Sequence, residues 1–283
     1  MKFVPMSELL QQAAQEGYAV PAFCVWNAET MEAVLRTSEA QKAPVILMSG
    51  PGEFGLLQPA DMGAIAQTLA RRFNVRAALH LDHGNSMEMV EACLRAGYTS
   101  VMLDYSARPF NENAEAMKRV VAAAHPMHVT VEGELGIIGQ VDQVTAEGGG
   151  YTALTDPTVA AAFVEATGID TLAVSIGNAH GMYTKLPQLD FDCLAKVHSA
   201  VRVPLVLHGG SGTPEPDLRR AISLGIAKVN VASELIKALR ESLLDQWGTG
   251  KNLWAPIAQA VAIEAMGKVV EKWFHLTGAA GRA

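Results

Sequence analysis

The sequence predicts an α/β protein of one domain, a (β/α)8 TIM barrel with extra C-terminal helices that spans residues 1–283. Two observations favour this fold. Short runs rich in apolar and β-branched residues alternate with longer segments of helical spacing, which is the pattern of parallel βαβ units. No linker rich in Pro, Gly or Ser divides the chain, and the glycine-dense stretch 146–156 falls inside one predicted strand-to-helix loop.

Strands and helices are placed by the change in hydrophobic spacing along the chain. Helix starts are marked by Ser86 as an N-cap, by Pro157 in a first turn, and by Pro214 followed by Glu215. Residues 232–275 should form the eighth helix and an additional helical cap. The expected strands are 18–23, 44–49, 76–82, 99–104, 127–134, 170–176, 204–208 and 226–231, and the expected helices include 28–42, 60–73, 86–96, 111–124, 157–167 and 214–224.

Composition excludes several classes of partner. The formal net charge is −7, without basic runs, so nucleic acid is not an expected partner. The first twenty residues lack the apolar core of a secretory signal, and no apolar run is long enough to cross a membrane. Cys24, Cys93 and Cys193 form no CxxC pair and are expected to be reduced thiols. These features predict a cytoplasmic protein.

Acidic and imidazole side chains stand where the predicted strands end. In a barrel of this kind the chemistry lies at the carboxyl ends of the strands, so side chains from different strands meet at one rim. His180 follows the sixth strand by a few residues, and His208 closes the seventh. The third, fourth and fifth strands end in Asp82 and His83, in Asp104, and in Glu134.

The three rim histidines predict a zinc site. Three neutral imidazoles with an open fourth position are typical of catalytic zinc, because they leave the cation able to polarise an oxygen. A single histidine at a strand end is more often an ordinary hydrogen-bonded residue, but three on different strands favour a metal. Each precedes a glycine, expected to permit the local bend. His80 shares strand parity with Asp82, so we expect it inside the barrel as a hydrogen-bonding neighbour rather than a ligand.

Two loops on the same rim predict a phosphate site. The glycine-rich loop after the seventh strand and the segment after the eighth both lead into helices, whose N-terminal N–H groups bind anions. Either loop alone is a common turn or cap. Together, beside His208, they indicate a phosphorylated substrate. The expected donors are Gly209, Gly210 and Ser211 from the first loop and Asn230, Val231, Ala232 and Ser233 from the second.

An ordered set of motifs resembles the class II, metal-dependent ketose-bisphosphate aldolases, most of all their tagatose-1,6-bisphosphate branch. The motifs are YAVPAF, HLDHG, SVMLD, GELG, AVSIGNAHGMY, LVLHGGSG and KVNVASEL, in this order between about residues 5 and 240. The resemblance implies Zn²⁺ bound through His83, His180 and His208. It also implies cleavage of a ketose 1,6-bisphosphate, of tagatose or fructose type, into dihydroxyacetone phosphate and glyceraldehyde 3-phosphate.

The resemblance also assigns roles to other residues. Asp82 would move the proton of the C4 hydroxyl, and Asp104 and Glu134 would hold a second, alternative metal position. Gly181 and the two loops would bind the C1 phosphate, with a monovalent cation such as Na⁺ or K⁺ nearby. The family places a glutamate for proton return on the loop after GELG, where this chain has Asp142. A homodimer or homotetramer is expected, with the apolar stripe of Trp254, Ile257, Val261, Trp273 and Phe274 as an interface or as packing on its own barrel.

The far end of the expected substrate site departs from the family. Cys24 stands where relatives have asparagine, and Gly50 stands where they have serine or threonine, with Ser49 beside it. The arginine that grips a far phosphate is missing, and the corresponding region offers only Lys251. The family's SHLPF becomes SARPF, which places Tyr105 and Arg108 near the mouth. An alternative is therefore an aldolase that releases an unphosphorylated or carboxylated aldehyde, and a second alternative is a non-catalytic sugar-phosphate-binding subunit.

Overall fold

The computed structural model describes residues 3–55, 57–140, 153–183, 186–251 and 254–283. Eight strands form a closed barrel in the order β1-β10-β9-β7-β5-β4-β3-β2, and every pairing is parallel. The predicted TIM barrel is thus confirmed. The barrel strands are β1 (Val20–Cys24), β2 (Val45–Ser49), β3 (Ala77–Gly84), β4 (Ser100–Leu103), β5 (Thr130–Leu135), β7 (Thr171–Val174), β9 (Leu205–Leu207) and β10 (Ile226–Val231).

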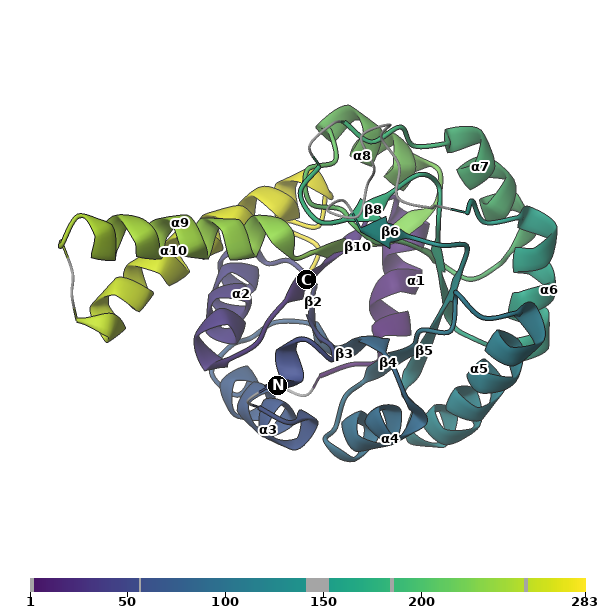
Figure 1. Ribbon diagram of the computed structural model, residues 1–283, viewed down its shortest axis with the longest axis horizontal. Coiled ribbons are helices and arrows are strands. Elements are labelled where there is room, and N and C mark those ends of the chain that lie inside the picture. The colour runs from purple at the N-terminus through teal and green to yellow at the C-terminus, as the bar shows by residue number, and fades with distance from the viewer. Residues whose placement is uncertain (1–2, 56, 141–152, 184–185, 252–253) are drawn as a thin grey trace.

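Helices surround the barrel, as Figure 1 shows. The side chain of Ser86 accepts the backbone N–H of Met89 at 3.2 Å, which confirms it as an N-cap, and Asp156 caps the helix that begins at Pro157. The helices are α1 (Met6–Glu16), α2 (Ala28–Gln41), α3 (Pro59–Ala70), α4 (Met87–Arg95), α5 (Phe110–Ala124), α6 (Pro157–Thr167), α7 (Phe191–Ala200), α8 (Glu215–Ser223), α9 (Ser233–Gly248) and α10 (Ala255–Leu276), with the 3-10 turns η1 (Glu53–Gly55) and η2 (His125–Met127).

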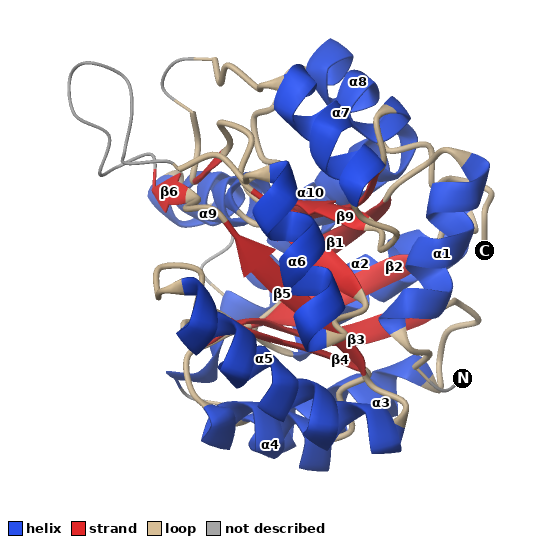
Figure 2. Cartoon of the chain, turned by 90° about the vertical axis from the view of Figure 1, so that its right-hand side faces the viewer, coloured by secondary structure: helices blue, strands red, loops and turns tan. Residues whose placement is uncertain are grey.

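Helix α1 was not predicted, although its sequence carries the signal. Met6, Leu9, Leu10 and Ala13 are buried at helical spacing. The backbone N–H of Ser7 donates to Thr130 Oγ1 at 2.9 Å, and Val4 donates to the carbonyl of Ala77, so the segment lies against the beginnings of β5 and β3. Figure 2 shows α1 at one end of the strands. It therefore closes the barrel at the end opposite the rim.

A small second sheet was also missed. Strand β6 (Gly139–Gln140) pairs in parallel with β8 (Ala179–His180), and Figure 2 shows β6 at the end of the barrel away from α1. Two-residue strands leave no hydrophobic pattern, so the sequence could not reveal them. The consequence is local but important. The pairing fixes the backbone of His180 above the mouth of the barrel.

Helices α9 and α10 pack on each other and extend away from the barrel in Figure 1. The inner part of α10 is buried, and Phe274 packs edge-to-face on Phe23 of β1 with ring centroids 5.6 Å apart. Trp254 at the start of α10 is 70% exposed. The predicted apolar stripe is therefore divided: Trp273 and Phe274 pack on their own barrel, while Trp254, Ile257 and Val261 face outward. Among the described residues, no helix is long and apolar enough to span a membrane.

Candidate metal and substrate site

Asp82 and His83 are neighbours that both face the mouth of the barrel. On β3, His80 and Leu81 pair with Ser100 and Val101 of β4, but Gly84 pairs with Leu103, so β3 holds one extra residue. This bulge turns two consecutive side chains to one side. The prediction that Gly84 permits the bend is wrong, because His83 itself adopts the left-handed conformation, with φ of 48°. A Cβ on Gly84 would lie 2.6 Å from the carbonyl oxygen of Met102, so glycine there permits close strand packing.

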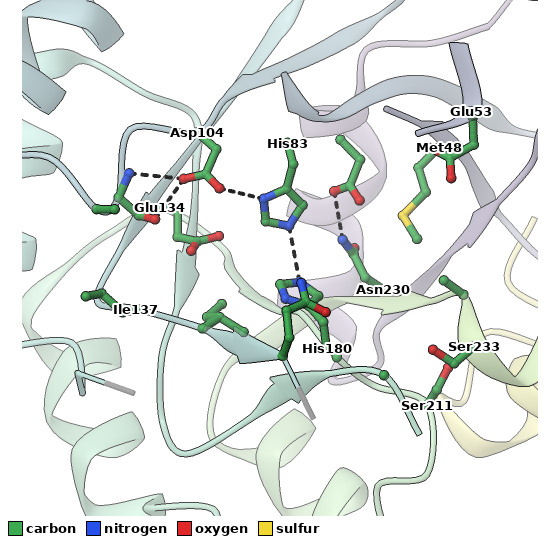
Figure 3. A pocket seen from close by; sticks show the side chains of 18 residues that line it. Met48, Glu53, His83, Asp104, Glu134, Ile137, His180, Ser211, Asn230 and Ser233 are labelled. Atoms are coloured by element: carbon green, nitrogen blue, oxygen red, sulfur yellow. Dashed lines mark hydrogen bonds and ion pairs between the residues drawn. The ribbon is translucent and has the colours of Figure 1, made fainter. Parts of the chain in front are cut away.

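The three predicted histidines converge. His83 Nε2 lies 3.2 Å from His180 Nε2 and 2.9 Å from His208 Nδ1. Nitrogen ligands about 2 Å from a common tetrahedral metal stand roughly 3.3 Å apart, so these separations are close to those of a metal site. Each of His83 and His208 offers its second ring nitrogen to a carboxylate: His83 Nδ1 lies 2.8 Å from Asp104 Oδ2, and His208 Nε2 lies 2.9 Å from Glu132 Oε1 (Figure 3 shows the first of these pairs).

These outer contacts orient the rings for metal binding. A carboxylate that accepts a hydrogen bond from the N–H of one ring nitrogen leaves the other ring nitrogen with a free lone pair for a metal. Burial lowers the pKa of His180 to about 4 and that of His208 well below its usual value, so both rings are neutral near pH 7. In the metal-free chain, burial alone would lower the pKa of His83, but the carboxylates of Asp82 and Asp104 raise it to about 10. Converging imidazoles inside a ring of carboxylates fit a divalent cation.

Asp104 and Glu134 form a second group with His83. Their potential ligand atoms and those of His83 all lie within 4.8 Å of one another. Burial raises the pKa of Glu134 to about 8. Glu134 Oε2 is buried and has no hydrogen-bond partner within the described residues, although His208 Nδ1 lies 3.5 Å away. A carboxylate oxygen without a partner, beside three imidazoles, also fits an adjacent cation.

Asp82 is held in place by a neighbouring amide. Asn230 Nδ2 donates to Asp82 Oδ1 at 2.9 Å. Burial would raise the pKa of Asp82, but positive charge at His83 and at Lys228 outweighs it and lowers the pKa below its ordinary value. Asp82 is therefore an ionised carboxylate beside the predicted metal position, able to accept a proton.

The site opens into a cavity of about 640 Å³ at the rim. Gly181, Gly209, Ser211, Asn230, Ala232 and Ser233 line it, as the sequence predicted. Gly210 and Val231 do not line it: the N–H of Gly210 donates to the carbonyl of Asn230 at 2.9 Å, and Val231 is buried in the core. Gly181 and Gly209 have φ values of 110° and 66°, so these two glycines do provide the bends predicted for them.

Glu234, a residue that the sequence analysis did not select, connects the two predicted phosphate loops. Its Oε1 accepts the backbone N–H of Gly212 at 2.9 Å, and its Oε2 accepts Trp273 Nε1 at 3.1 Å and Lys272 Nζ at 3.0 Å. The N–H of Glu234 itself donates to Ser211 Oγ at 3.3 Å. The loop after β9 is thereby fixed to the start of α9 and to α10.

A buried ion pair below the metal group was also missed. Lys228 Nζ contacts both oxygens of Glu132, at 3.0 and 2.8 Å, and His80 Nε2 at 3.3 Å, and all three residues are fully buried. His80 also bonds Ser100 Oγ at 2.8 Å. The predicted hydrogen-bonding position of His80 inside the barrel is thus observed. Strand parity was the available signal. Lys228 lies two residues before Asn230 on one strand and Glu132 two residues before Glu134 on another, so each pair faces the same side.

The predicted far-end residues lie in different places. Cys24 bonds Glu53, whereas Ser49 is buried and bonds the hydroxyl of Tyr98 at 2.8 Å, so Ser49 does not replace the family's hydroxyl residue in the cavity. Lys251 pairs with Asp245 on the projecting helices. Ser106 and Ala107 line the cavity, but their neighbours Tyr105 and Arg108 do not. Asp142 lies outside the described residues, so the structure does not place the predicted proton donor.

Comparison with known proteins agrees with this geometry. The family model for class II fructose-bisphosphate aldolases matches residues 4–282. The structure of the YdjI aldolase from Escherichia coli K12 is similar over 99% of both chains, with 36% identity and a TM-score of 0.89. A candidate fructose-1,6-bisphosphate aldolase from Coccidioides immitis is 30% identical over 97% of this chain and 96% of that one, with a TM-score of 0.87. A fructose-bisphosphate aldolase from Campylobacter jejuni, 21% identical over 100% and 97% of the two chains, shares the fold with a TM-score of 0.85. The chain therefore belongs to the class II fructose-bisphosphate aldolase family.

Proposed function

We propose that this aldolase is zinc-dependent and cleaves a ketose 1-phosphate unit, reversibly, into dihydroxyacetone phosphate and an aldehyde. The observation that carries the proposal is the ionised Asp82 beside three converging imidazoles, between two loops suited to a phosphate. The fully phosphorylated candidate is a ketose 1,6-bisphosphate of tagatose or fructose type, which releases glyceraldehyde 3-phosphate. A second candidate, favoured by the changed residues near Cys24 and Gly50, releases an aldehyde without a phosphate.

The proposed mechanism assigns each step to a side chain. His83, His180 and His208 would hold a divalent cation, which when bound would supply Lewis-acid stabilisation of negative charge on the substrate oxygens. The carboxylate of Asp82 accepts the proton of the C4 hydroxyl as the C3–C4 bond breaks, and Asn230 holds that carboxylate in position. Asp142 then returns a proton to the dihydroxyacetone fragment, as the sequence predicted. Asp104 and Glu134 offer the cation its alternative position.

Phosphate binding is proposed at the loops that follow β9 and β10. Gly181, Gly209 and Ser211 line the cavity, together with Ala232 and Ser233 at the start of α9. Backbone N–H groups at a helix N-terminus favour an anion there. A monovalent cation beside these loops, Na⁺ or K⁺, is part of the proposal.

The proposal is tested by metal analysis together with two activity measurements. Zinc-loaded protein should release dihydroxyacetone phosphate from a sugar-phosphate panel and should exchange a C–H proton of dihydroxyacetone phosphate with solvent. Chelation should abolish both activities, and zinc should restore them. Asp82→Asn should bind the metal but lower cleavage by at least about 100-fold, since it lacks the proton acceptor. Absence of exchange in the metal-loaded protein would instead favour a non-catalytic sugar-phosphate-binding subunit.

We also propose a cytoplasmic homodimer or homotetramer. The three cysteines are unpaired, as expected in a reducing compartment. The projecting helices expose Trp247, Trp254 and Ile257, an apolar group suited to a second copy of the chain.

A further inference from the structure

The wall of the cavity formed by the end of β2 and the turn after it contains an acidic residue without an assigned role. Glu53 begins η1, directly after β2, and lines the cavity together with Met48. Figure 3 shows Glu53 and Met48 on one side of His83, and Asp104 and Glu134 on the other. Glu53 is therefore separate from the second group of potential metal ligands.

Two hydrogen bonds fix the Glu53 carboxylate. Its Oε2 accepts the backbone N–H of Gly50 at 2.8 Å, and its Oε1 accepts the thiol of Cys24 at 3.3 Å. Burial raises the pKa of Cys24 well above its usual value, and Glu53 adds to this, so the thiol keeps its proton and acts as a donor. A carboxylate has about four acceptor positions, so roughly two remain for a ligand. The positions that depart from the family, 24 and 50, thus both serve to hold Glu53.

Gly50 allows this carboxylate to lie close to Asp82, the proposed proton acceptor. A Cβ at residue 50 would lie 2.3 Å from the backbone carbonyl oxygen of Asp82, so a serine or threonine would not fit in this arrangement. The same Cβ position is 3.6 Å from Glu53 Oε2. Glu53 therefore neighbours Asp82, and Asp82 is where the C4 hydroxyl of the substrate would lose its proton. If Asp82 takes that proton, the part of the substrate beyond C4 would lie on this side of the cavity.

The charge of the cavity opposes a second anion at this place. Its lining includes the carboxylates of Glu53, Asp82 and Asp104 and the carboxyl group of Glu134, and no Lys or Arg among the described residues. Lys228, the buried cation below, is paired with Glu132. A cation held by the histidines would offset carboxylates on its own side, and the phosphate loops supply N–H donors only at the C1 end. A phosphate or carboxylate beside Glu53 would meet like charge at close range.

We propose that Glu53 determines the aldehyde specificity, accepting hydrogen bonds from hydroxyl groups beyond the cleaved bond and disfavouring an anionic group there. The preferred substrate is then a ketose 1-phosphate whose far end is an uncharged, hydroxylated chain. This inference rests on the proposed aldolase function and narrows its substrate class.

The test compares substrates that differ only at the far end. Cleavage of tagatose and fructose 1-phosphates is measured against the 1,6-bisphosphates and against a ketose 1-phosphate that ends in a carboxylate. Condensation of dihydroxyacetone phosphate is measured with glyceraldehyde and with glyceraldehyde 3-phosphate. The wild-type protein should prefer the uncharged member of each set by about tenfold or more in kcat/KM.

Variants of Glu53 separate its charge from its shape. Glu53→Gln should shift the ratio of kcat/KM for charged over uncharged aldehydes upward by at least about tenfold, mainly through KM for the aldehyde, because repulsion is removed. Glu53→Asp keeps the charge and should keep the order of preference. Glu165→Gln, an exposed glutamate on α6, should change nothing. Thermal unfolding and metal content of each variant establish that the fold and the metal site are intact.

The outcomes distinguish the two proposals. A wild-type preference for bisphosphates or for the carboxylate, or an unchanged ratio in folded, metal-loaded Glu53→Gln, overturns the role of Glu53 and leaves the aldolase function standing. Absence of both cleavage and proton exchange in the zinc-loaded wild type overturns the proposed function, and the specificity proposal with it.

Discussion

Two glutamates on one strand show how differently the barrel treats buried charge. Glu132 and Glu134 lie two residues apart on β5, so both face inward, and both are almost completely buried. Glu132 is paired with Lys228, which lowers its pKa despite burial. Glu134 has no such partner, and its pKa is raised to about 8. The ion pair of Glu132 fixes the ring of His208. Ionised Glu134 destabilises the metal-free fold, and a bound cation would remove that destabilisation.

Glu134 therefore predicts a pH-dependent stability of the metal-free protein. Its pKa is about 8 in the fold and about 4.3 in an unfolded chain, so the fold loses stability as pH rises between these values. Glu134→Gln removes that loss. Metal-free Glu134→Gln should be no more stable than wild type near pH 4.5 but more stable by roughly 4 kcal/mol at pH 8, measured by urea unfolding after chelation.

Asp104 provides a control of opposite sign. Hydrogen bonds and charge from His83 lower the pKa of Asp104, so its ionised form contributes stability above about pH 4 that is lost as the pH falls through the folded pKa. Metal-free Asp104→Asn should thus be less stable than wild type at pH 8. A loss of stability in both variants at pH 8 would contradict the account of Glu134.

At the scale of elements, the beginning of α9 is joined to its surroundings by Glu234. One carboxylate receives the N–H of Gly212 from the loop after β9 and the indole N–H of Trp273 from α10. The phosphate loops are thus connected to the helix that packs on β1 and α2. If the loop after β9 is already held in place by α10, less conformational entropy is lost when a phosphate binds to it.

Glu234→Ala should therefore weaken phosphate binding without changing the metal group. Three donors lose their acceptor, the N–H of Gly212, the indole of Trp273 and the exposed Lys272. Stability should therefore fall by about 1–3 kcal/mol, and KM for the sugar phosphate should rise roughly tenfold. Lys272→Met removes only an exposed partner of the same carboxylate and should cost less than about 1 kcal/mol. Steady-state kinetics and urea unfolding measure both effects. Equal effects of the two variants on KM would rule out the loop connection as the cause.

At the scale of the whole molecule, the eight barrel strands could be predicted from the sequence. Helix α1 at one end of the barrel and the β6–β8 pair at the other were not predicted. Each predicted strand is found within a few residues, because apolar runs between polar turns report strand burial directly. The fifth begins at Thr130 rather than 127, since His125–Met127 forms a 3-10 turn. The pairing of β6 with β8 carries too few residues for a pattern.

The site was predictable to the extent that it depends on strand ends. His83, His180, His208, Asp82, Asp104 and Glu134 all meet at the rim, as parallel strands require. The contacts of Glu132, Lys228, Glu53 and Glu234 were not predictable. Parity gives the side of the sheet on which a residue lies, but partners across a barrel depend on strand order and stagger.

The projecting helices predict an oligomer at the same scale. Trp254 is 70% exposed at the tip of the projecting helices α9 and α10. A charge there should separate the subunits if these helices form the interface. Trp254→Glu should shift the mass measured by light scattering towards the monomer. Met127→Glu, which places a charge on an exposed methionine of η2, should leave the mass unchanged. A monomeric wild type at micromolar concentration would contradict the proposed assembly.

The extra residue in β3 has a consequence for how reliably the chemistry survives thermal motion. Asp82 and His83 are separated by a single peptide unit, and the bulge turns both to the same side, so the proposed proton acceptor lies beside the proposed metal ligand. The separation of their Cα atoms is set by covalent geometry, which barely changes when loops fluctuate. Other pairs in the site rely on strands that meet only in three dimensions. Asp82 and His83 therefore move as a unit, and the separation of their backbones does not depend on how the strands pack.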